Sequence, residues 1–418
     1  MATSRYVPRI ADAPLAGLLA ELPAIMVTGP RAAGKTTSAR RIANDVLRLD
    51  DPAVAAAVAA NPDAALRRTR EPVLLDEWQE VPEILGAVKR AVDDDPRPGR
   101  FLLTGSVEAD FATRQWPGTG RVVRLVLHGL TEREISGSVA QPSLLDLLLN
   151  SDLSRLHVSG PPPSLDDYVD LALRSGFPEA ALNLSAPGRL AWLDAYIDHA
   201  VTRDVLAAGE QRDPVRLRRY LEVLGLSTAE LPPPDGTLYQ AAGINQRTAD
   251  AYDWILAALY LIDLVPAWST NRLNRLTRRA KRYLTDPALA LAAARVDERS
   301  VLRDGDLLGR LLDTFVLAQL RPEVTLLHPR ARLHHLRSRD GHEVDVVIDL
   351  GGGQVIAIEI KASSAPSARD AHHLVWLRDQ LGEGFRAGVV FHTGPMPFDL
   401  DDRIWALPIS ALWTARTE

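Results

Sequence analysis

The 418-residue sequence contains no cysteine and very few lysines, and both absences narrow what the protein can be. Without cysteine there are no disulfides, thiolate zinc sites or thiol nucleophiles, and nothing requires an oxidising compartment. Any metal site must therefore use oxygen or imidazole ligands. Only Lys35, Lys89, Lys281 and Lys361 among the 48 basic residues are lysines. Since arginine is the usual cation here, each lysine raises the question of why arginine would not serve; one reason is that only a compact ammonium can enter a tight oxygen cage.

A hydrophobic run long enough to span a bilayer, which takes about 20 continuous apolar residues, is also missing. The apolar stretch at 13–27 is interrupted by Glu21 and Pro23, and the stretch at 254–265 is too short and contains Asp263. We therefore expect a cytoplasmic protein. The net charge of −6 does not attract nucleic acid or anionic membrane, so any such contact needs a local basic patch.

What is present is the composition of a soluble globular protein, and the length suggests two to four domains of about 100 to 200 residues each. Residues 1–135 alternate short apolar runs with helix-like patterns, which indicates a parallel sheet covered by helices on both faces. The expected strands lie at 24–27, 46–50, 73–76, 101–104 and 122–127.

Two proline-rich breaks, at 160–163 and 232–236, divide the rest of the chain. Helical patterns follow the first break. After the second break the sequence predicts a helix, a turn and a second helix, and then a β-hairpin wing at 265–286. The last part is predicted to be α/β, with strands at 333–336, 344–348, 355–360 and 387–391 and a helix at 368–381. The predicted fold class is therefore α/β, with a parallel-sheet domain at 1–135, a helical and winged-helix-like domain at 165–300 and an α/β domain at 305–418.

A phosphate-binding loop of the form G-x-x-x-x-G-K-[ST] directly follows the first predicted strand and precedes a helical run. Its glycines let backbone N–H groups surround phosphates, and the helix N-terminus adds a positive dipole end. Lys35 should reach the β- and γ-phosphates, and the Thr36 hydroxyl should bind Mg²⁺, so ATP and Mg²⁺ are the expected ligands. The expected nucleotide-binding residues are Gly29, Pro30, Arg31, Ala32, Ala33, Gly34, Lys35, Thr36 and Thr37.

Polar residues at later strand ends complete this predicted site. Asp76 is expected to hold Mg²⁺ through water, and Glu77 to polarise the attacking water, a pair that ATP hydrolysis needs. Thr104, with Gly105 and Ser106 beyond it, could report loss of the γ-phosphate. Arg121 could offer its guanidinium to a phosphate of the same or a neighbouring subunit. A polar strand end and a surface arginine are the ordinary alternatives for these last two features.

The motifs GPRAAGKTT, LLDEWQE, FLLTGS and TGR together resemble the bacterial and archaeal AAA-type ATPase family that carries a C-terminal domain of unknown function. The resemblance continues at residues 176–179 (GFPE), at 203–204 and at 281–286, so it covers nearly the whole chain. It implies a P-loop ATPase with an attached C-terminal module.

The C-terminal part contains a second set of chemically active residues. Alternation along a strand places Glu359 and Lys361 on one face, and Asp345 joins them if its strand is a neighbour. Two carboxylates and a lysine suit a divalent cation, held by Asp345 and Glu359, and an activated water. This pattern resembles the PD-(D/E)xK nuclease fold. In such nucleases an acidic residue on a helix completes the site, and the family pattern places a glutamate at position 313. This chain has the shorter aspartate there, Asp313. The alternative is a fold kept for packing or partner binding.

A basic segment follows the helix-turn-helix pattern and contains no acidic residue. It fits a wing that contacts a duplex DNA backbone, while Asn245, Gln246, Arg247 and Thr248 open the candidate recognition helix. The alternative is a solvated face or a docking surface for the ATPase domain. The basic residues are Arg272, Arg275, Arg278, Arg279, Lys281 and Arg282.

Two functions remain open on the sequence alone. The first is a DNA-associated, Mg²⁺-dependent ATPase with a nuclease-like module. The second is an ATP-switched regulator or defence-type adaptor, monomeric or homo-oligomeric, that binds a protein partner and uses the nuclease-like fold as a scaffold. Salt-dependent DNA binding would favour the first, and a co-purifying protein the second.

Overall fold

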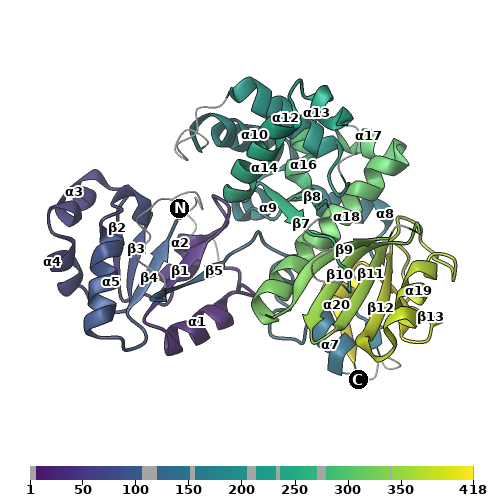
Figure 1. Cartoon of the computed structure of the whole chain (residues 1–418), viewed down its shortest axis with the longest axis horizontal. Coiled ribbons are helices and arrows are strands. Elements are labelled where there is room, and N and C mark those ends of the chain that lie inside the picture. Colours follow the sequence, from purple (N-terminus) through teal and green to yellow (C-terminus); the bar gives the residue numbers. More distant parts are fainter. Residues whose placement is uncertain are drawn as a thin grey trace.

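A computed structural model of the chain describes residues 6–105, 120–150, 156–204, 213–231, 236–270, 279–328, 330–338 and 340–417. Figure 1 shows an N-terminal lobe in purple and blue, a helical lobe in teal, and a C-terminal sheet lobe in green and yellow. Within the described part, no helix combines the length and the apolar character that crossing a membrane requires.

The N-terminal lobe is built on a five-stranded parallel sheet of order β2-β3-β4-β1-β5. All five predicted strands are present, with ends that differ by at most two residues. The strands are β1 (Ala24–Thr28), β2 (Asp45–Arg48), β3 (Val73–Asp76), β4 (Phe101–Thr104) and β5 (Val122–Val126). The helices are α1 (Asp12–Glu21), α2 (Lys35–Arg40), α3 (Pro52–Ala60), α4 (Pro62–Arg67), α5 (Ile84–Asp94) and α6 (Glu132–Ile135).

Alternation along β1 explains why helices cover both faces of this sheet. Ile25 belongs to the same buried cluster as Leu15 of α1, whereas Met26 belongs to the cluster that contains Ile84 and Val88 of α5. Successive side chains of a strand point to opposite faces, so an uninterrupted apolar strand requires a helix layer on each side. The sheet thereby exposes its carboxyl-terminal edge for a ligand.

The elements of the helical lobe lie in the predicted order, but one of the predicted helices is shorter than expected. Its elements are α8 (Leu165–Leu173), α9 (Pro178–Asn183), α10 (Ala186–His199), α12 (Pro214–Leu226), α13 (Thr237–Ala241), α14 (Gln246–Ala258), β7 (Ile262–Val265), β8 (Lys281–Leu284), α16 (Pro287–Ala294) and α17 (Glu298–Arg303), with a π-helical turn at Ala200–Asp204. The sequence pattern predicted that the helix beginning at Gln246 extends to residue 264. This helix, α14, ends at Ala258, because Tyr260 just beyond it has a left-handed φ of 57°. β7 and β8 pair as an antiparallel hairpin.

The C-terminal lobe is a six-stranded mixed sheet of order β13-β14-β12-β11-β10-β9. β9, β10 and β11 are antiparallel neighbours, and β11, β12 and β14 are parallel. The elements are α18 (Gly305–Pro322) and the π-helical turn Glu323–Leu327, then β9 (Arg332–Arg337), β10 (Glu343–Gly351), β11 (Gln354–Ile360), α19 (His372–Leu381), β12 (Phe385–His392), β13 (Phe398–Asp401), β14 (Ile404–Pro408), α20 (Ala411–Thr414) and β15 (Ala415–Thr417).

Residues that precede the helical lobe in sequence, and its first helix α8, pack on the third lobe. Helix α7 (Leu144–Asn150) and α8 contribute Leu144 and Tyr168 to the core cluster that contains Phe315 of α18 and Val389 of β12. Strand β6 (Leu156–Val158) pairs with β15 at the end of the chain. Tyr283 of β8 joins the same cluster, so the helical and C-terminal lobes share one apolar core.

Candidate functional site

The phosphate-binding loop folds over the carboxyl end of β1. Gly29 has φ 137°, and a Cβ there would lie 2.1 Å from the Leu127 carbonyl oxygen, so no other residue fits. Gly34 adopts φ 94° as the residue before α2, which places the N-terminus of that helix beneath the loop. Both glycines of the sequence pattern are thus required by backbone geometry.

Lys35 is folded back onto its own loop. Its Nζ donates hydrogen bonds to the carbonyl oxygens of Gly29 at 3.0 Å and Pro30 at 2.8 Å, and the side chain is buried. Burial lowers the pKa of Lys35 to about 8, although the carboxylates of Glu77 and Asp76 oppose the shift. A buried ammonium bonded only to carbonyls can exchange these partners for phosphate oxygens.

Asp76 joins the ends of three elements at this edge. Its Oδ1 accepts hydrogen bonds from Thr36 Oγ1 of α2 at 2.7 Å and from Thr104 Oγ1 of β4 at 2.5 Å. Asp76 and Thr104 are both buried. The predicted Mg²⁺ ligands Thr36 and Asp76 are therefore brought together, and their oxygen donors fit a Mg²⁺ ion.

Glu77 lies at the same edge in a left-handed conformation, with φ 54° and ψ 51°, which is uncommon for glutamate. Its Oε2 accepts a hydrogen bond from Gln79 Nε2. The sequence analysis included Gln79 only as part of the motif LLDEWQE and gave it no role. A Cβ on Gly105 would lie 2.8 Å from Trp78 Nε1, so the strand end and this turn touch closely. The predicted Ser106 lies outside the described residues.

Arg121 lies at the opposite edge of the sheet. It precedes β5, whose Val122 pairs with Ala24 at the start of β1, whereas the phosphate-binding loop follows the end of β1. Its Nε donates to Asp93 at the end of α5 at 2.8 Å. Arg121 therefore does not reach the phosphate-binding loop of its own chain.

A cavity of about 980 Å³ adjoins the loop, and the helical lobe supplies its second wall. Residues of α9 and α10, including Pro178, Glu179 and Tyr196, face Lys35 and Thr36 of the N-terminal lobe across it. The Tyr196 hydroxyl donates to the Arg31 carbonyl oxygen at 3.4 Å. In the sequence, the GFPE motif only contributed to the family resemblance. In the structure, its last two residues, Pro178 and Glu179, line the candidate nucleotide cavity.

Arg9 is a site residue that the sequence analysis missed. Its guanidinium donates to the Ala33 carbonyl of the loop at 2.8 Å, to the His128 carbonyl at 2.7 Å and to the Glu134 carboxylate at 3.0 Å. Arg9 and Glu134 are both buried. No sequence motif marked Arg9, because its partners lie in segments distant along the chain.

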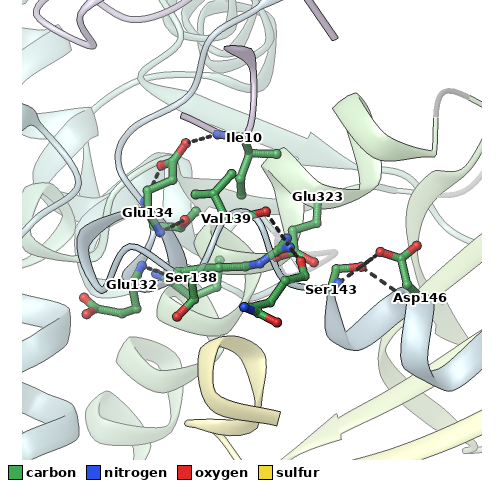
Figure 2. Close-up of polar contacts among 12 residues, drawn as sticks. Ile10, Glu132, Glu134, Ser138, Val139, Ser143, Asp146 and Glu323 are labelled. Carbon is green, nitrogen blue, oxygen red and sulfur yellow. Dashed lines mark hydrogen bonds and ion pairs between the residues drawn. The ribbon is translucent and has the colours of Figure 1, made fainter. Parts of the chain in front are cut away.

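Helix α6 continues this network into the C-terminal lobe. Figure 2 shows Glu134 accepting a hydrogen bond from the Ile10 amide, at 2.7 Å, and Glu323 close to the loop that carries Val139. Arg133 Nη1 donates to Glu323 Oε1 at 2.9 Å, and the Glu132 amide donates to Gln319 of α18 at 2.7 Å. Burial raises the pKa of Glu323 to about 7 despite the Arg133 guanidinium.

A second route between the lobes runs through β8. Just after this strand, the Asp286 carboxylate accepts hydrogen bonds from Ser175 Oγ at 2.9 Å and from the Gly176 amide at 2.6 Å. The Gly176 carbonyl in turn accepts a hydrogen bond from the Leu130 amide of the N-terminal lobe at 2.6 Å. A turn that touches the N-terminal lobe and leads into α9 is therefore tied to β8.

The predicted C-terminal carboxylates do converge, but a lysine from another lobe lies among them. Glu359 Oε2 accepts a hydrogen bond from Lys361 Nζ at 2.7 Å, and Asp345 Oδ2 accepts one from the Ile360 amide at 3.0 Å. Lys281 Nζ of β8 lies 3.4 Å from Asp345 Oδ1 and 3.7 Å from Glu343 Oε1.

As folded, these residues do not fit a divalent cation, because the Lys281 ammonium already neutralises Asp345. In the described part of the chain, no group of three or more histidine, cysteine, aspartate or glutamate side chains is arranged to hold a metal ion. Asp313 of α18 contributes electrostatically: burial and the Asp345 charge raise the pKa of Asp313 to about 7. The expected metal role of Asp345 and Glu359 is therefore not met in this arrangement.

Two basic residues assigned to a DNA-binding wing are buried. Lys281 is 3% exposed, and Arg282 is 7% exposed with its Nε donating to Asp253 Oδ2 at 2.7 Å. Because both side chains are buried and paired with acidic residues, neither can contact a phosphate backbone. This part of the prediction was therefore wrong. Arg279 is exposed. Arg272, Arg275 and Arg278 lie outside the described residues. Exposed Gln246 and Arg247 start α14, whereas the side chain of Asn245 caps that helix.

Comparison with known proteins identifies the N-terminal lobe and leaves the others without an activity. Residues 21–136 match an AAA domain, residues 165–300 a domain of unknown function (DUF8612), and residues 308–412 another (DUF4143). The AAA match supports ATP binding by the N-terminal lobe.

Similar proteins extend over nearly the whole chain. An uncharacterized protein of Mycobacterium tuberculosis is 29% identical over 412 residues, covering 97% of this chain and 84% of its own, and one of Mycobacterium bovis matches to the same extent. Among solved structures, a Walker-type ATPase of Pyrococcus abyssi aligns with a TM-score of 0.42 and 11% identity, covering 69% of this chain and 96% of that one.

Proposed function

We propose that the protein is a Mg²⁺-dependent ATPase that uses nucleotide binding and hydrolysis to change how its helical and C-terminal lobes are held. The observation that carries this proposal is the cavity beside Lys35, because its two walls belong to different lobes. A ligand that fills such a cavity interacts with both lobes and so biases their arrangement.

The roles of the residues follow from their placement at the sheet edge. Lys35 would exchange its carbonyl partners for the β- and γ-phosphates of ATP, and Thr36 and Asp76 would hold Mg²⁺. The bound ion would offset negative charge on the phosphates. Glu77, oriented by Gln79, would hold and polarise the attacking water, and Thr104 would link Asp76 to the state of the γ-phosphate.

Transmission would use the two hydrogen-bonded routes that leave the nucleotide site. Arg9 joins the loop carbonyl of Ala33 to Glu134 of α6, and α6 contacts the C-terminal lobe through Arg133 and Glu323. The other route leads from α9 through Gly176 and Asp286 to β8. Each route crosses between lobes at one hydrogen bond, Arg133 to Glu323 in the first and the Leu130 amide to the Gly176 carbonyl in the second, so movement of one lobe strains the other.

The experiment that tests the proposal replaces Glu77 by glutamine. Glu77→Gln should keep nucleotide affinity and lose about 10²- to 10⁴-fold in turnover, because it removes the water-polarising charge and leaves the phosphate cradle intact. ATP turnover and binding of a fluorescent nucleotide are the measurements. Glu83→Gln, at an exposed carboxylate outside the cavity, is the matched control and should hydrolyse ATP at the parent rate. Parental turnover in Glu77→Gln would show that the water-activating role lies elsewhere.

A DNA-associated nuclease is the second candidate, and the convergence of Asp345, Glu359 and Lys361 in one cluster favours it. ATP turnover with and without duplex DNA tests the association. DNA cleavage in Mg²⁺ or Mn²⁺ that Asp345→Ala abolishes tests the activity. The burial of Lys281 and Arg282 instead favours the regulatory or adaptor function, in which the C-terminal lobe binds a protein partner.

A further inference from the structure

A second cavity, of about 400 Å³, lies where the three lobes meet. Its wall includes Val126 and His128 of the N-terminal lobe, Leu171 and Ile262 of the helical lobe, and Phe315 of α18 in the C-terminal lobe. Cavities of about 300–1,000 Å³ at domain interfaces are common places for small molecules to bind. A ligand in this cavity would contact all three lobes.

The phosphate-binding loop and the turn into α9 separate this cavity from the nucleotide cavity. Pro30 lines the second cavity, whereas Lys35 lines the first. Phe177 and Pro178, neighbours in the turn, likewise line the second and the first cavity. The Pro30 carbonyl oxygen is also one of the two that accept hydrogen bonds from Lys35 Nζ, at 2.8 Å. A ligand against Pro30 would therefore touch a residue whose carbonyl Lys35 must release to bind phosphate.

The polar groups of the second cavity offer a ligand hydrogen-bond donors but little net positive charge. Arg321 of α18 lines the cavity with its side chain 15% exposed, and it forms an ion pair with Asp263, which is 23% exposed. Arginine has five N–H donors, and Nη2 of Arg321 has no hydrogen-bond partner among the described residues. Burial lowers the pKa of His128 to about 3, so this imidazole is neutral at neutral pH.

The other carboxylates of the cavity wall already have partners. Asp286 accepts hydrogen bonds from Ser175 Oγ at 2.9 Å and from the Gly176 amide at 2.6 Å, and Glu132 is paired with Arg174. An anionic ligand would be buried near these carboxylates, and the nearby guanidinium charge is already balanced, so its desolvation would not be offset. An uncharged ligand needs only an acceptor for the guanidinium and an apolar body for the surrounding alkyl and aromatic side chains.

We propose that the second cavity binds a small uncharged molecule with an apolar body and a hydrogen-bond acceptor, and that this molecule opposes nucleotide binding. The cavity exists in the arrangement in which the Pro30 carbonyl holds Lys35, and a ligand favours the arrangement to which it binds. Nucleotide favours the arrangement in which Lys35 contacts phosphate. Binding to the second cavity is independent of the proposed function, whereas its effect on nucleotide rests on that function.

Three probes of similar shape test the class of ligand: acetophenone, which has a carbonyl acceptor, ethylbenzene, which has none, and benzoate, which is an anion. Saturation-transfer NMR measures their binding to the full chain without nucleotide. Acetophenone should bind at least about tenfold more tightly than ethylbenzene, because a hydrogen bond from a charged donor is worth that factor or more. Benzoate should also bind more weakly than acetophenone. Equal binding of ethylbenzene, or tighter binding of benzoate, would overturn the assigned ligand class.

A cavity-filling variant tests where acetophenone binds. Ala318→Leu fills the cavity from α18 without changing a polar group, and it should abolish acetophenone binding. Ala251→Leu is the matched control, because this partly buried alanine of α14 lines neither cavity, and it should bind acetophenone as the parent does. If Ala318→Leu does not fold, Ala257→Leu fills the cavity from α14 instead. Unchanged acetophenone binding in a folded cavity-filling variant would contradict the assigned site.

The effect on nucleotide is measured with a fluorescent ATP analogue at saturating acetophenone. The nucleotide affinity of the parent should fall about fivefold or more, which is the lower end of typical couplings between sites, and nucleotide should weaken acetophenone binding by the same factor. The affinity of Ala318→Leu should not respond. A chain that binds acetophenone but no nucleotide would contradict the proposed function and not this binding site. Nucleotide binding that acetophenone leaves unchanged would overturn the regulatory part of the inference.

Discussion

Lys35 is a residue of the candidate nucleotide site whose acid–base chemistry the fold alters. It is buried against two carbonyl oxygens, and burial lowers its pKa from 10.5 to about 8. Between these two values the unfolded chain binds more protons than the folded chain, so this group makes the free protein more stable as the pH rises from about 8 to 10.5. Nucleotide binding has the opposite dependence, because phosphates favour the charged form.

We therefore expect ATP affinity to fall as the pH rises through 8, approaching tenfold per pH unit, since the free protein must then take up a proton to bind. Calorimetry at pH 9 in buffers of different ionisation enthalpy should detect uptake of about one proton. Lys89→Ala removes an exposed lysine paired with Asp93 and should leave the pH profile unchanged. Affinity that stays constant from pH 7 to 9.5 would contradict the role given to Lys35.

At the scale of elements, close packing of helices in the second lobe depends on single glycines. A Cβ on Gly225 of α12 would lie 2.4 Å from the Ala290 carbonyl oxygen of α16, so Gly225→Ala should destabilise the protein by about 1–3 kcal/mol. Gly309 of α18 has no atom within 4 Å of such a Cβ, and Gly309→Ala should be neutral or stabilising by up to about 1 kcal/mol. Urea unfolding measures both. Equal effects would mean that α12 and α16 are not packed this closely.

Helix α6 is the element that joins the ATPase lobe to the C-terminal lobe. Arg133→Met should cost about 3 kcal/mol at pH 8, because it leaves the Glu323 carboxylate buried without its cation. The pKa of Glu323 is already raised to about 7, so at pH 5 the residue is protonated and the cost should shrink.

Urea unfolding at the two pH values provides the measurement. Arg133→Met/Glu323→Leu is the control, and it should recover more than half of the loss at pH 8 because no unpaired charge remains. A loss that is the same at both pH values would mean that the unpaired charge is not its cause.

At the scale of the whole molecule, the sheet keeps Arg121 away from the phosphates of its own chain, so we propose that it acts in trans. Lys35→Ala, which retains Arg121, and Arg121→Ala, which retains the nucleotide site, should each be inactive. Mixing the two should restore ATP turnover, because one chain supplies the site and the other the guanidinium. Turnover is measured against total protein concentration, with Arg124→Ala in place of Arg121→Ala as the control. No recovery in mixed oligomers would leave Arg121 as the partner of Asp93.

Much of the ATPase lobe could be predicted from the sequence, because its signals are local. The five strands are short apolar runs bounded by polar residues, and the loop pattern at 29–36 specifies the backbone positions where glycine is required. The convergence of Thr36, Asp76 and Thr104 also follows from sequence, since the carboxyl ends of neighbouring parallel strands meet at one edge. Local pattern was sufficient to place these residues at strand ends, whereas the strand order that makes β3 and β4 neighbours came from the structure.

Only the tertiary structure decided what the remaining charged residues do. Arg9 carries no signal that distinguishes it from a surface cation. Lys281 is one of only four lysines, but the sequence analysis still counted it as part of an exposed basic patch. Their partners lie 125 and 64 positions away, at Glu134 and Asp345. A charge is buried only where the fold supplies a counter-charge to offset its desolvation, so its role depends on which distant segments pack together. The sequence by itself indicated the residues of the candidate nucleotide site, and packing between lobes placed a second wall beside them and Lys281 against Asp345.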